Sequence, residues 1–302
     1  MYTVTLSKFK GGVGATEAAF QISALYALAG WRVLVVDADP HGGITKRFLG
    51  KKGGIGILTL ADAVDAYIAD RKNPKVSLSH VIRTVRVRQD MRKNGFSTVA
   101  MVPANLSLHD EENSVGNMPV GRMKVLKRML ATVADQYDIC MIDTSPDFGY
   151  ISRNAVVAAD GLLLPLLPEP PSFEALQELR DQLVMMAEEE HVPGIVGTIA
   201  SRFSMKSTRH AVAETLLRIA SGECQMEELS LYDGEGEKFD ISSIAGLRAD
   251  YLGSVANDNS KSSQMNLRKS YMPIAAALAK NIGLGVLNLE VTEAHHAAKI
   301  SN

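Results

Sequence analysis

A run of glycines, placed between a strand pattern and a helix pattern, is the feature that most constrains how this chain can fold. Residues 8–17 read KFKGGVGATE. Before the glycines, Val4 and Leu6 alternate with polar residues, and after them apolar residues follow helical spacing from Ala18 to a stop at Gly30. Strand, glycine loop and helix in this order predict a tightly curled loop whose backbone N–H groups point at a bound anion.

The loop is close to the phosphate-binding pattern G-x-x-x-x-G-K-[ST], in which Lys reaches the β- and γ-phosphates and Ser or Thr ligates Mg²⁺. Gly14 and Thr16 fit this pattern, and Ala15 occupies the lysine position. An ordinary strand-to-helix turn is the alternative interpretation of the glycines. The strand and helix patterns on either side favour the nucleotide-type site.

Apolar runs alternate with helical patterns along the chain, which is typical of crossover units in a parallel sheet. We therefore expect an α/β protein with a doubly wound, mostly parallel sheet flanked by helices. The strands are predicted at Val4–Phe9, Arg32–Asp37, Asp138–Asp143, Gly161–Leu167 and Gly194–Ala200. The helices are predicted at about Glu17–Ala29, Ala61–Ala69, Val120–Gln136, Phe173–His191, Thr208–Ala220 and Tyr271–Ile282.

We expect one domain over residues 1–290, with insertions at about 49–117 and 221–263, followed by a C-terminal tail at 291–302. The first insertion has one helical segment and a basic run at 83–93. Alternating Val and Arg in this run favour an edge strand or hairpin with a solvated basic face over a nucleic-acid contact. The second insertion is rich in Ser, Gly, Asp and Glu, which predicts long surface loops.

Composition limits the partners and the compartment. The 302 residues carry a net charge of −2, so any contact with nucleic acid must rest on local basic patches. Two cysteines, Cys140 and Cys224, cannot form a disulfide framework, and Cys140 is expected to be a small buried residue of a strand. No signal peptide is expected, and no apolar run approaches the ~18 residues of a spanning helix. We therefore expect a cytoplasmic protein.

Three aspartates follow the predicted strands. Asp37 and Asp39 end the second strand, and Asp143 ends the third. Ligands of doubly wound sheets bind at the carboxyl ends of the strands, so these acids are expected to meet the glycine loop. An Asp after an apolar strand is the pattern that holds Mg²⁺ in nucleotide hydrolases.

Taken together, these motifs resemble the ParA/MinD family of deviant-Walker ATPases, and within it the ParA partition branch, whose members have the P-loop NTPase fold. The resemblance rests on KGGVGAT at 10–16, DADPHG at 37–42, VPANLSL at 102–108, YDICMIDTSP at 137–146 and LPLLPEP at 164–170. The matches span roughly residues 1–220 and leave the final third of the chain uncovered.

The resemblance implies a role for each matching position. Lys10 would cross a dimer interface to the partner's nucleotide, and Asp39 would orient the attacking water, so these two are the catalytic candidates. Nucleotide contacts are implied for Lys10, Gly11, Gly12, Val13, Gly14, Ala15, Thr16, Glu17, Pro168 and Glu169. Metal contacts are implied for Thr16, Asp39 and Asp143.

The resemblance also implies cofactors and partners. It implies ATP or ADP with Mg²⁺, and a homodimer that closes on ATP, binds DNA non-specifically and positions plasmid, chromosome or other cargo. It implies a ParB-like or other cargo adaptor as a partner, no membrane, and a nucleoid-associated location. The candidate DNA contacts are Arg202, Lys206, Arg209, Arg268 and Lys269, for which a solvated helix face is the alternative.

Ala15 makes the enzymatic activity doubtful. A lysine at this position would supply contacts to phosphate worth about 1.5–3 kcal/mol each. We therefore expect weak or absent ATP hydrolysis, whether Ala15 is a substitution in a working ATPase or the mark of a natural branch. A non-hydrolysing adaptor that positions a protein cargo is the alternative function. A membrane-positioning relative would need a basic amphipathic helix, which 291–302 does not show. A metal-cluster relative would carry cysteines for the cluster near the dimer interface, a pattern that Cys140 and Cys224 do not supply.

Overall fold

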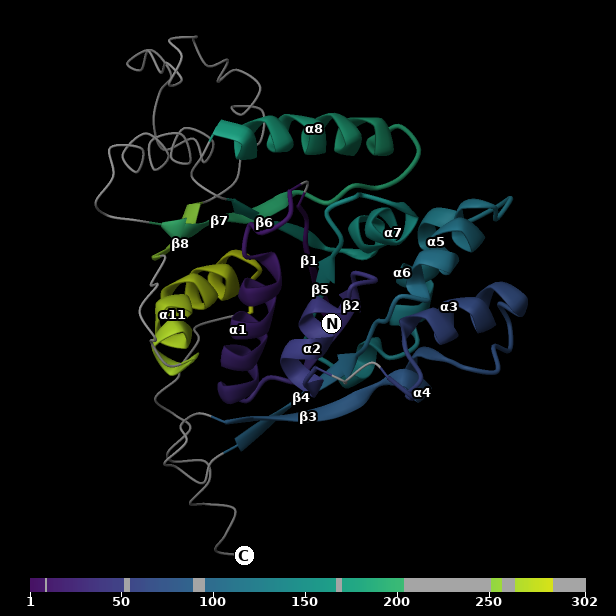
Figure 1. Ribbon diagram of the computed structural model, residues 1–302, viewed down its shortest axis with the longest axis horizontal. Coiled ribbons are helices and arrows are strands. Elements are labelled where there is room, and N and C mark those ends of the chain that lie inside the picture. The colour runs from purple at the N-terminus through teal and green to yellow at the C-terminus, as the bar shows by residue number, and fades with distance from the viewer. Residues whose placement is uncertain are drawn as a thin grey trace, which may run out of the picture.

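The chain folds around an eight-stranded sheet with helices on both faces (Figure 1). The computed structural model describes residues 1–8, 10–51, 55–88, 96–166, 170–203, 251–256 and 264–284. In spatial order the strands are β3 (Arg83–Arg88), β4 (Phe96–Val102), β2 (Val33–Ala38), β5 (Ile139–Thr144), β1 (Tyr2–Leu6), β6 (Gly161–Leu166), β7 (Ile195–Phe203) and β8 (Tyr251–Ala256). All neighbouring pairs are parallel except β3 with β4.

The central strands are apolar on both faces because helices cover both faces. Every residue of β2, β5 and β6 is buried, and their sequences VLVVDA, ICMIDT and GLLLPL have no polar face. The edge strand β3 differs, since its sequence RTVRVR alternates Arg or Thr with Val. This alternation, with β3 antiparallel at the edge of the sheet, confirms the predicted edge hairpin.

Two helical layers enclose the sheet. One face is covered by α1 (Ala15–Leu28), α2 (Gly43–Leu49) and α11 (Gln264–Asn281). The other is covered by α3 (Leu60–Ala69), α4 (Leu78–Val81), α5 (Leu108–Gly116), α6 (Val125–Ala131) and α7 (Tyr150–Ala158). Figure 1 shows α8 (Pro170–Ala187) beside α7, on the side of β6 and β7 away from α11.

The first helix is buried almost all round. Most residues of α1 are buried because α1 lies between the sheet and α11. Its Tyr26 hydroxyl donates a hydrogen bond of 3.0 Å to the backbone oxygen of Ala275 on α11. The helix that follows the glycine loop is therefore held from both sides.

The doubly wound fold and the five predicted strands are confirmed, with boundaries that differ by up to three residues. The predicted helices at Glu17–Ala29, Ala61–Ala69 and Phe173–His191 correspond to α1, α3 and α8. The helix predicted at Tyr271–Ile282 begins earlier, at Gln264. The helix predicted at Thr208–Ala220 lies outside the described residues.

The single helix predicted at Val120–Gln136 was wrong. This stretch contains a 3-10 turn η1 (Arg122–Lys124), then α6, then a second 3-10 turn η2 (Ala134–Gln136). Gly121 before it has φ 73°, outside the helical range. At the end of α6 the Thr132 hydroxyl donates to the Met129 carbonyl at 2.7 Å, and this bond competes with another α-helical turn.

The two proposed insertions contain more structure than expected. Residues 49–117 hold α4 and α5 in addition to the predicted helix and edge hairpin, and β4 pairs with β2 inside the sheet. Residues 221–263 include the strand β8, which pairs with β7, where only loops were predicted. The boundaries of the domain and of the tail at 291–302 remain predictions. In the part of the chain that is described, no helix is long and apolar enough to cross a membrane.

Candidate functional site

The glycine loop joins the C-terminal end of β1 to the start of α1. Gly12 and Gly14 have φ of 80° and 84°, a region that residues with a Cβ rarely adopt. Gly14 precedes α1 as its N-cap and offers no side-chain cap, while its carbonyl oxygen accepts a 2.9 Å hydrogen bond from Ala18. The first N–H groups of α1 therefore have no side-chain cap, which is the arrangement that binds phosphate in other proteins.

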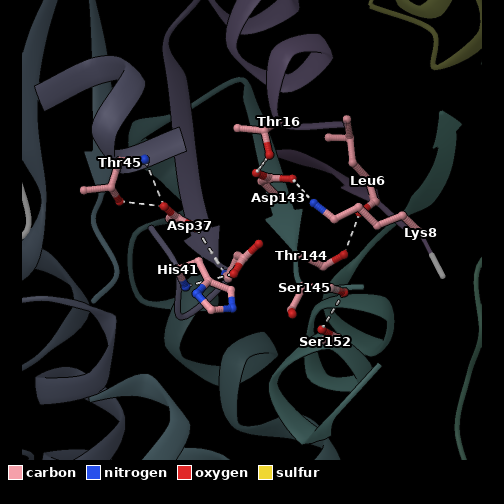
Figure 2. A network of polar contacts seen from close by, with 11 residues as sticks. Leu6, Lys8, Thr16, Asp37, His41, Thr45, Asp143, Thr144, Ser145 and Ser152 are labelled. Atoms are coloured by element: carbon pink, nitrogen blue, oxygen red, sulfur yellow. Dashed lines mark hydrogen bonds and ion pairs between the residues drawn. The ribbon is translucent and has the colours of Figure 1, made fainter. Parts of the chain in front are cut away.

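A buried carboxylate lies beside this loop. Asp143 is fully buried at the end of β5, and the Thr16 hydroxyl donates to its Oδ2 at 2.6 Å. On the other side, Lys8 Nζ donates to Asp143 Oδ1 at 3.2 Å, as Figure 2 shows. Lys8 reaches it because β1 and β5 are parallel neighbours with Leu6 opposite Asp143. Segments 135 residues apart thus meet at one carboxylate.

Neighbouring groups act in opposite directions on the charge of the Asp143 carboxylate. Burial raises the pKa of Asp143, and the nearby negative charge of Asp39 adds to the increase. The Lys8 ammonium and the Thr16 hydroxyl act in the opposite direction, since both stabilise the carboxylate. Lys8 is itself only 8% exposed, so it contributes a positive charge with little solvent around it.

A second buried carboxylate lies opposite the first. Asp37 of β2 pairs in register with Asp143 of β5 and is fully buried. Its Oδ2 accepts from the Thr45 N–H at 2.9 Å and from the Thr45 hydroxyl at 2.6 Å (Figure 2). Burial, together with the negative charge of Asp143, raises the pKa of Asp37 to about 7. The hydroxyl of Thr45 also accepts from the Ala104 N–H at 2.9 Å.

Asp37 holds the loop that carries Asp39. The N–H of Asp39 donates to Asp37 Oδ1 at 3.1 Å, and Asp39 Oδ1 accepts from the His41 N–H at 2.9 Å. The following Gly43 comes so close to the first turn of α1 that a Cβ there would lie 3.3 Å from Thr16 Cγ2. The loop after β2 and the glycine loop therefore form one continuous surface at the carboxyl ends of the strands.

The oxygen ligands at this surface fit a magnesium ion. Among the described residues there is no group of three or more His, Cys, Asp or Glu side chains that could hold a metal on its own. Thr16 and Asp143 instead offer a hydroxyl and a carboxylate that already share a hydrogen bond. Mg²⁺ is commonly held by one or two protein oxygens together with phosphates of a substrate, so this pair suits that ion.

Comparison with known proteins decides the family. A family model described as an AAA domain matches residues 1–192. The chromosome-partitioning ATPase Soj of Treponema pallidum is 30% identical over 219 residues, which cover 72% of this chain and 76% of Soj. The chain belongs to the ParA/MinD family of P-loop ATPases. A virulence plasmid ParA family protein of Chlamydia psittaci, pGP5-D, is 28% identical over the same shares of the two chains.

Solved structures agree with the fold of this ParA-family chain. A plasmid partition protein from Borrelia burgdorferi gives a TM-score of 0.64 at 21% identity, covering 92% of this chain and 98% of that one. A cobyrinic acid a,c-diamide synthase from Mycobacterium smegmatis, with a bound ATP analogue and magnesium, gives 0.68 at 19% identity, covering 95% and 98%. At these identities the likeness concerns the fold alone.

In this ParA-family chain the residues predicted for the loop lie together. Gly11 and Gly12 are exposed, Val13 is buried, and Lys10 is partly buried at the start of the loop. Ala15 is the first residue of α1 and is 2% exposed, so its methyl group brings no charge to the loop. Pro168 and Glu169 lie outside the described residues.

Glu17, for which a nucleotide contact was predicted, has protein partners in this structure. Its carboxylate accepts two hydrogen bonds from Arg47 of α2, at 2.7 and 2.5 Å, and one from Gln21 at 2.7 Å. The Arg47 guanidinium also lies 4.7 Å from the centre of the Phe20 ring. In this structure Glu17 therefore joins α1 to α2.

The candidate DNA contacts do not form a described patch. Arg202 belongs to β7, and Arg268 and Lys269 belong to α11, but the side chains of all three lie outside what the structure describes. Lys206 and Arg209 lie outside the described residues altogether. Because β7 is parallel to β6 and β6 to β1, Arg202 near the end of β7 lies at the same sheet edge as the glycine loop.

Two residues of the site had no assigned role in the sequence analysis. Lys8 was part of the quoted loop segment, and its position two residues before Lys10 was the available signal. Thr45 lies in a helix that was not predicted, and nothing in its local sequence marks it as a partner of Asp37. Lys8 is placed by the register of β1 and β5, and Thr45 by its position in the first turn of α2, eight residues after Asp37; local patterns revealed neither contact.

Proposed function

We propose that this chain is a ParA-like ATP-binding protein that positions plasmid, chromosome or other cargo as a nucleotide-dependent homodimer on DNA. The observation that carries the proposal is the pairing of Thr16 with Asp143 directly beside a glycine loop that opens α1. Family membership supports it, since relatives at 28–30% identity are a partitioning ATPase and a plasmid ParA family protein. The partner we expect is a ParB-like or other cargo adaptor.

Each residue of the site has a place in this proposal. The backbone N–H groups of residues 11–16 hold the phosphates, and Thr16 with Asp143 holds Mg²⁺. The metal supplies charge neutralisation for phosphoryl transfer when it is bound. Asp39 orients a water molecule or contacts the metal. Its carboxylate accepts from the His41 N–H, and its own N–H donates to Asp37. Lys10 reaches the nucleotide of the second protomer.

Ala15 sets the expected activity. In our alignment with the loop pattern Ala15 takes the lysine position, and its methyl group cannot neutralise charge that develops on the γ-phosphate. We therefore propose that this chain retains ATP binding while its ATP hydrolysis is weak or absent. The alternative function, a non-hydrolysing adaptor that positions a protein cargo, has the same support from Ala15 and differs in needing no phosphate release.

The test measures binding, hydrolysis and assembly separately. Fluorescent ATP with MgCl₂ is titrated into the full chain, phosphate release is followed with and without DNA, and the mass in solution is measured with and without nucleotide. Saturable binding with slow phosphate release, faster in Ala15→Lys, and a nucleotide-dependent dimer on DNA support the proposal. Binding and dimerisation without any phosphate release in either version favour the adaptor. Absence of nucleotide binding in both versions rejects the proposal.

A further inference from the structure

Lys8 has no part in the proposed function, yet its ammonium lies within the site, on the carboxylate of Asp143. Its ammonium contacts Asp143 Oδ1 at 3.2 Å while Thr16 occupies Oδ2 at 2.6 Å (Figure 2). Both oxygens of the carboxylate that we assign to Mg²⁺ are thus occupied, one by an ammonium group and one by a hydroxyl. The Lys8 ammonium therefore sits within the group of atoms that would surround the metal and the terminal phosphates.

The surroundings of Lys8 explain why a cation is stable there. Asp143 and Asp37 are fully buried register partners on adjacent strands, and Asp39 of the next loop is 8% exposed. Three acids at one buried edge favour a positive charge among them, because an unpaired buried charge is costly. Neutralising Asp143 is accordingly one role that Lys8 fulfils in the folded chain.

A second observation points to more than neutralisation. Ala15 is buried at the first position of α1 and contributes no charge, while Lys8 contacts Asp143 from just beyond the end of β1. The chain thus has an uncharged residue at the loop position where the phosphate-binding pattern has its lysine. It also has a buried lysine a few residues earlier, directed at the metal-binding carboxylate.

We propose that Lys8 supplies in cis the phosphate-binding charge that Ala15 cannot supply, an inference that rests on the proposed nucleotide site. Without nucleotide, the ammonium stays on Asp143. With a nucleoside triphosphate present, the Lys8 ammonium would move from Asp143 Oδ1 to a neighbouring phosphate oxygen, and Asp143 would then be available to hold Mg²⁺. Lys8 is then a nucleotide-binding residue and not only the partner of a buried acid.

This role differs measurably from a structural one. If Lys8 only stabilises the fold, its loss lowers the melting temperature and weakens nucleotide binding equally whatever stands at position 15. If Lys8 substitutes for the loop lysine, a lysine restored at position 15 makes Lys8 dispensable for binding. The two substitutions must then be coupled, as residues are that serve the same group.

The test is a double-mutant cycle on the full chain, with the dissociation constant of fluorescent ATP in MgCl₂ as the readout. The variants are Lys8→Gln, which keeps a donor for Asp143 but removes the charge, Lys8→Arg, which keeps the charge, Ala15→Lys, and Lys8→Gln combined with Ala15→Lys. Lys124→Gln, on a partly exposed lysine paired with Glu190 at 2.9 Å, is the matched control for loss of a paired lysine. Melting temperatures are recorded for every variant.

We expect Lys8→Gln to weaken binding roughly 10- to 100-fold, the loss of one or two charge-assisted contacts. The ATP affinity should change less than about threefold in Lys8→Arg and in Lys124→Gln. In the Ala15→Lys background, Lys8→Gln should lower the ATP affinity less than about threefold. Ala15→Lys alone should raise the ATP affinity less than about tenfold, and this measurement is informative even if Lys8→Gln does not fold. A gain in ATP affinity far above tenfold in Ala15→Lys overturns the inference. Unchanged ATP binding by Lys8→Gln, or an equal loss from Lys8→Gln in both backgrounds, overturns it as well.

If the parent chain binds ATP in these cases, the proposed function survives. If neither the parent chain nor Ala15→Lys binds ATP, the inference and the proposed function both fail.

Discussion

Asp37 and Asp143 lie opposite each other on the neighbouring parallel strands β2 and β5, and both are fully buried. Each carboxylate has its own set of donors: Thr45 and the N–H of Asp39 for Asp37, and Lys8 and Thr16 for Asp143. Among the contacts described for these two acids, an ammonium group contacts Asp143. This difference explains why one acid serves the architecture of the loops and the other suits a cation site.

Stability in magnesium-free and nucleotide-free buffer should fall as the pH rises toward neutrality because of Asp37. The pKa of an unfolded Asp is about 3.9, whereas burial raises that of Asp37 to about 7. Protonated Asp37 therefore contributes stability that is fully present below about pH 4 and is lost as the pH approaches 7. Urea unfolding of the parent chain and Asp37→Asn should show a difference in free energy that changes by up to ~1.4 kcal/mol per pH unit in this window. Parallel curves for the two proteins would contradict the prediction.

Thr45→Val should destabilise the fold by about 1–3 kcal/mol, because it removes the hydroxyl that donates to Asp37 and accepts from the buried N–H of Ala104. Chemical denaturation is the measurement. Thr132→Val is the matched control, since the Thr132 hydroxyl bonds the Met129 carbonyl at the exposed end of α6. The control should change the unfolding free energy by less than about 0.5 kcal/mol. Equal effects would mean that the Asp37 network adds nothing beyond an ordinary surface hydroxyl.

Arg47→Met should lower stability by about 1–2 kcal/mol. The guanidinium contacts both oxygens of Glu17 and lies over Phe20, and about a third of its side chain is exposed. Arg32 forms a similar contact with Asp138 at 2.7 Å, but 57% of its side chain is exposed. Arg32→Met should therefore lower stability less than Arg47→Met does. The order of the two losses in thermal unfolding decides the prediction, and a larger loss for Arg32 contradicts it.

DNA binding, if it uses the first half of α11, should depend on Arg268 and Lys269. Each phosphate contact contributes about 0.9 to the slope of log affinity against log salt. Replacing both residues by Gln should lower that slope by up to about 2, measured by fluorescence anisotropy with duplex DNA of random sequence. Arg86→Gln, on the edge strand β3, is the control and should leave the slope unchanged. An unaltered slope in the double variant removes α11 from the list of DNA contacts.

Local sequence patterns were sufficient for the glycine loop and for the five strands β1, β2, β5, β6 and β7, but not for β4 and β8. Burial on both faces produces continuous apolar runs such as ICMIDT and VLVVDA, and the loop needs Gly12 and Gly14 at positive φ, so both leave a direct trace in the sequence. Asp143 and Thr16 were assigned to one site because strand ends of a parallel sheet share an edge. The 2.6 Å bond between their side chains agrees with that expectation.

Patterns of short range did not reveal the contacts between distant segments. Glu17 matched a loop position, yet its partner Arg47 comes from α2, a helix of seven residues without a clear start signal. Lys8 gained significance only when the register of β1 and β5 placed it beside Asp143. The helix predicted at Val120–Gln136 failed because the apolar spacing continues while Thr132 and Gly121 interrupt the backbone.

The bond between Tyr26 and Ala275 fastens the last described helix to the first. Since α1 starts at the glycine loop, a protein that binds α11 acts on a helix that is bonded to α1. Coupled binding equilibria are reciprocal. Nucleotide binding at the glycine loop must therefore change the affinity of such a protein by the same factor by which that protein changes the affinity for the nucleotide. Tyr26→Phe removes the hydrogen bond to Ala275 and should reduce both of these factors together.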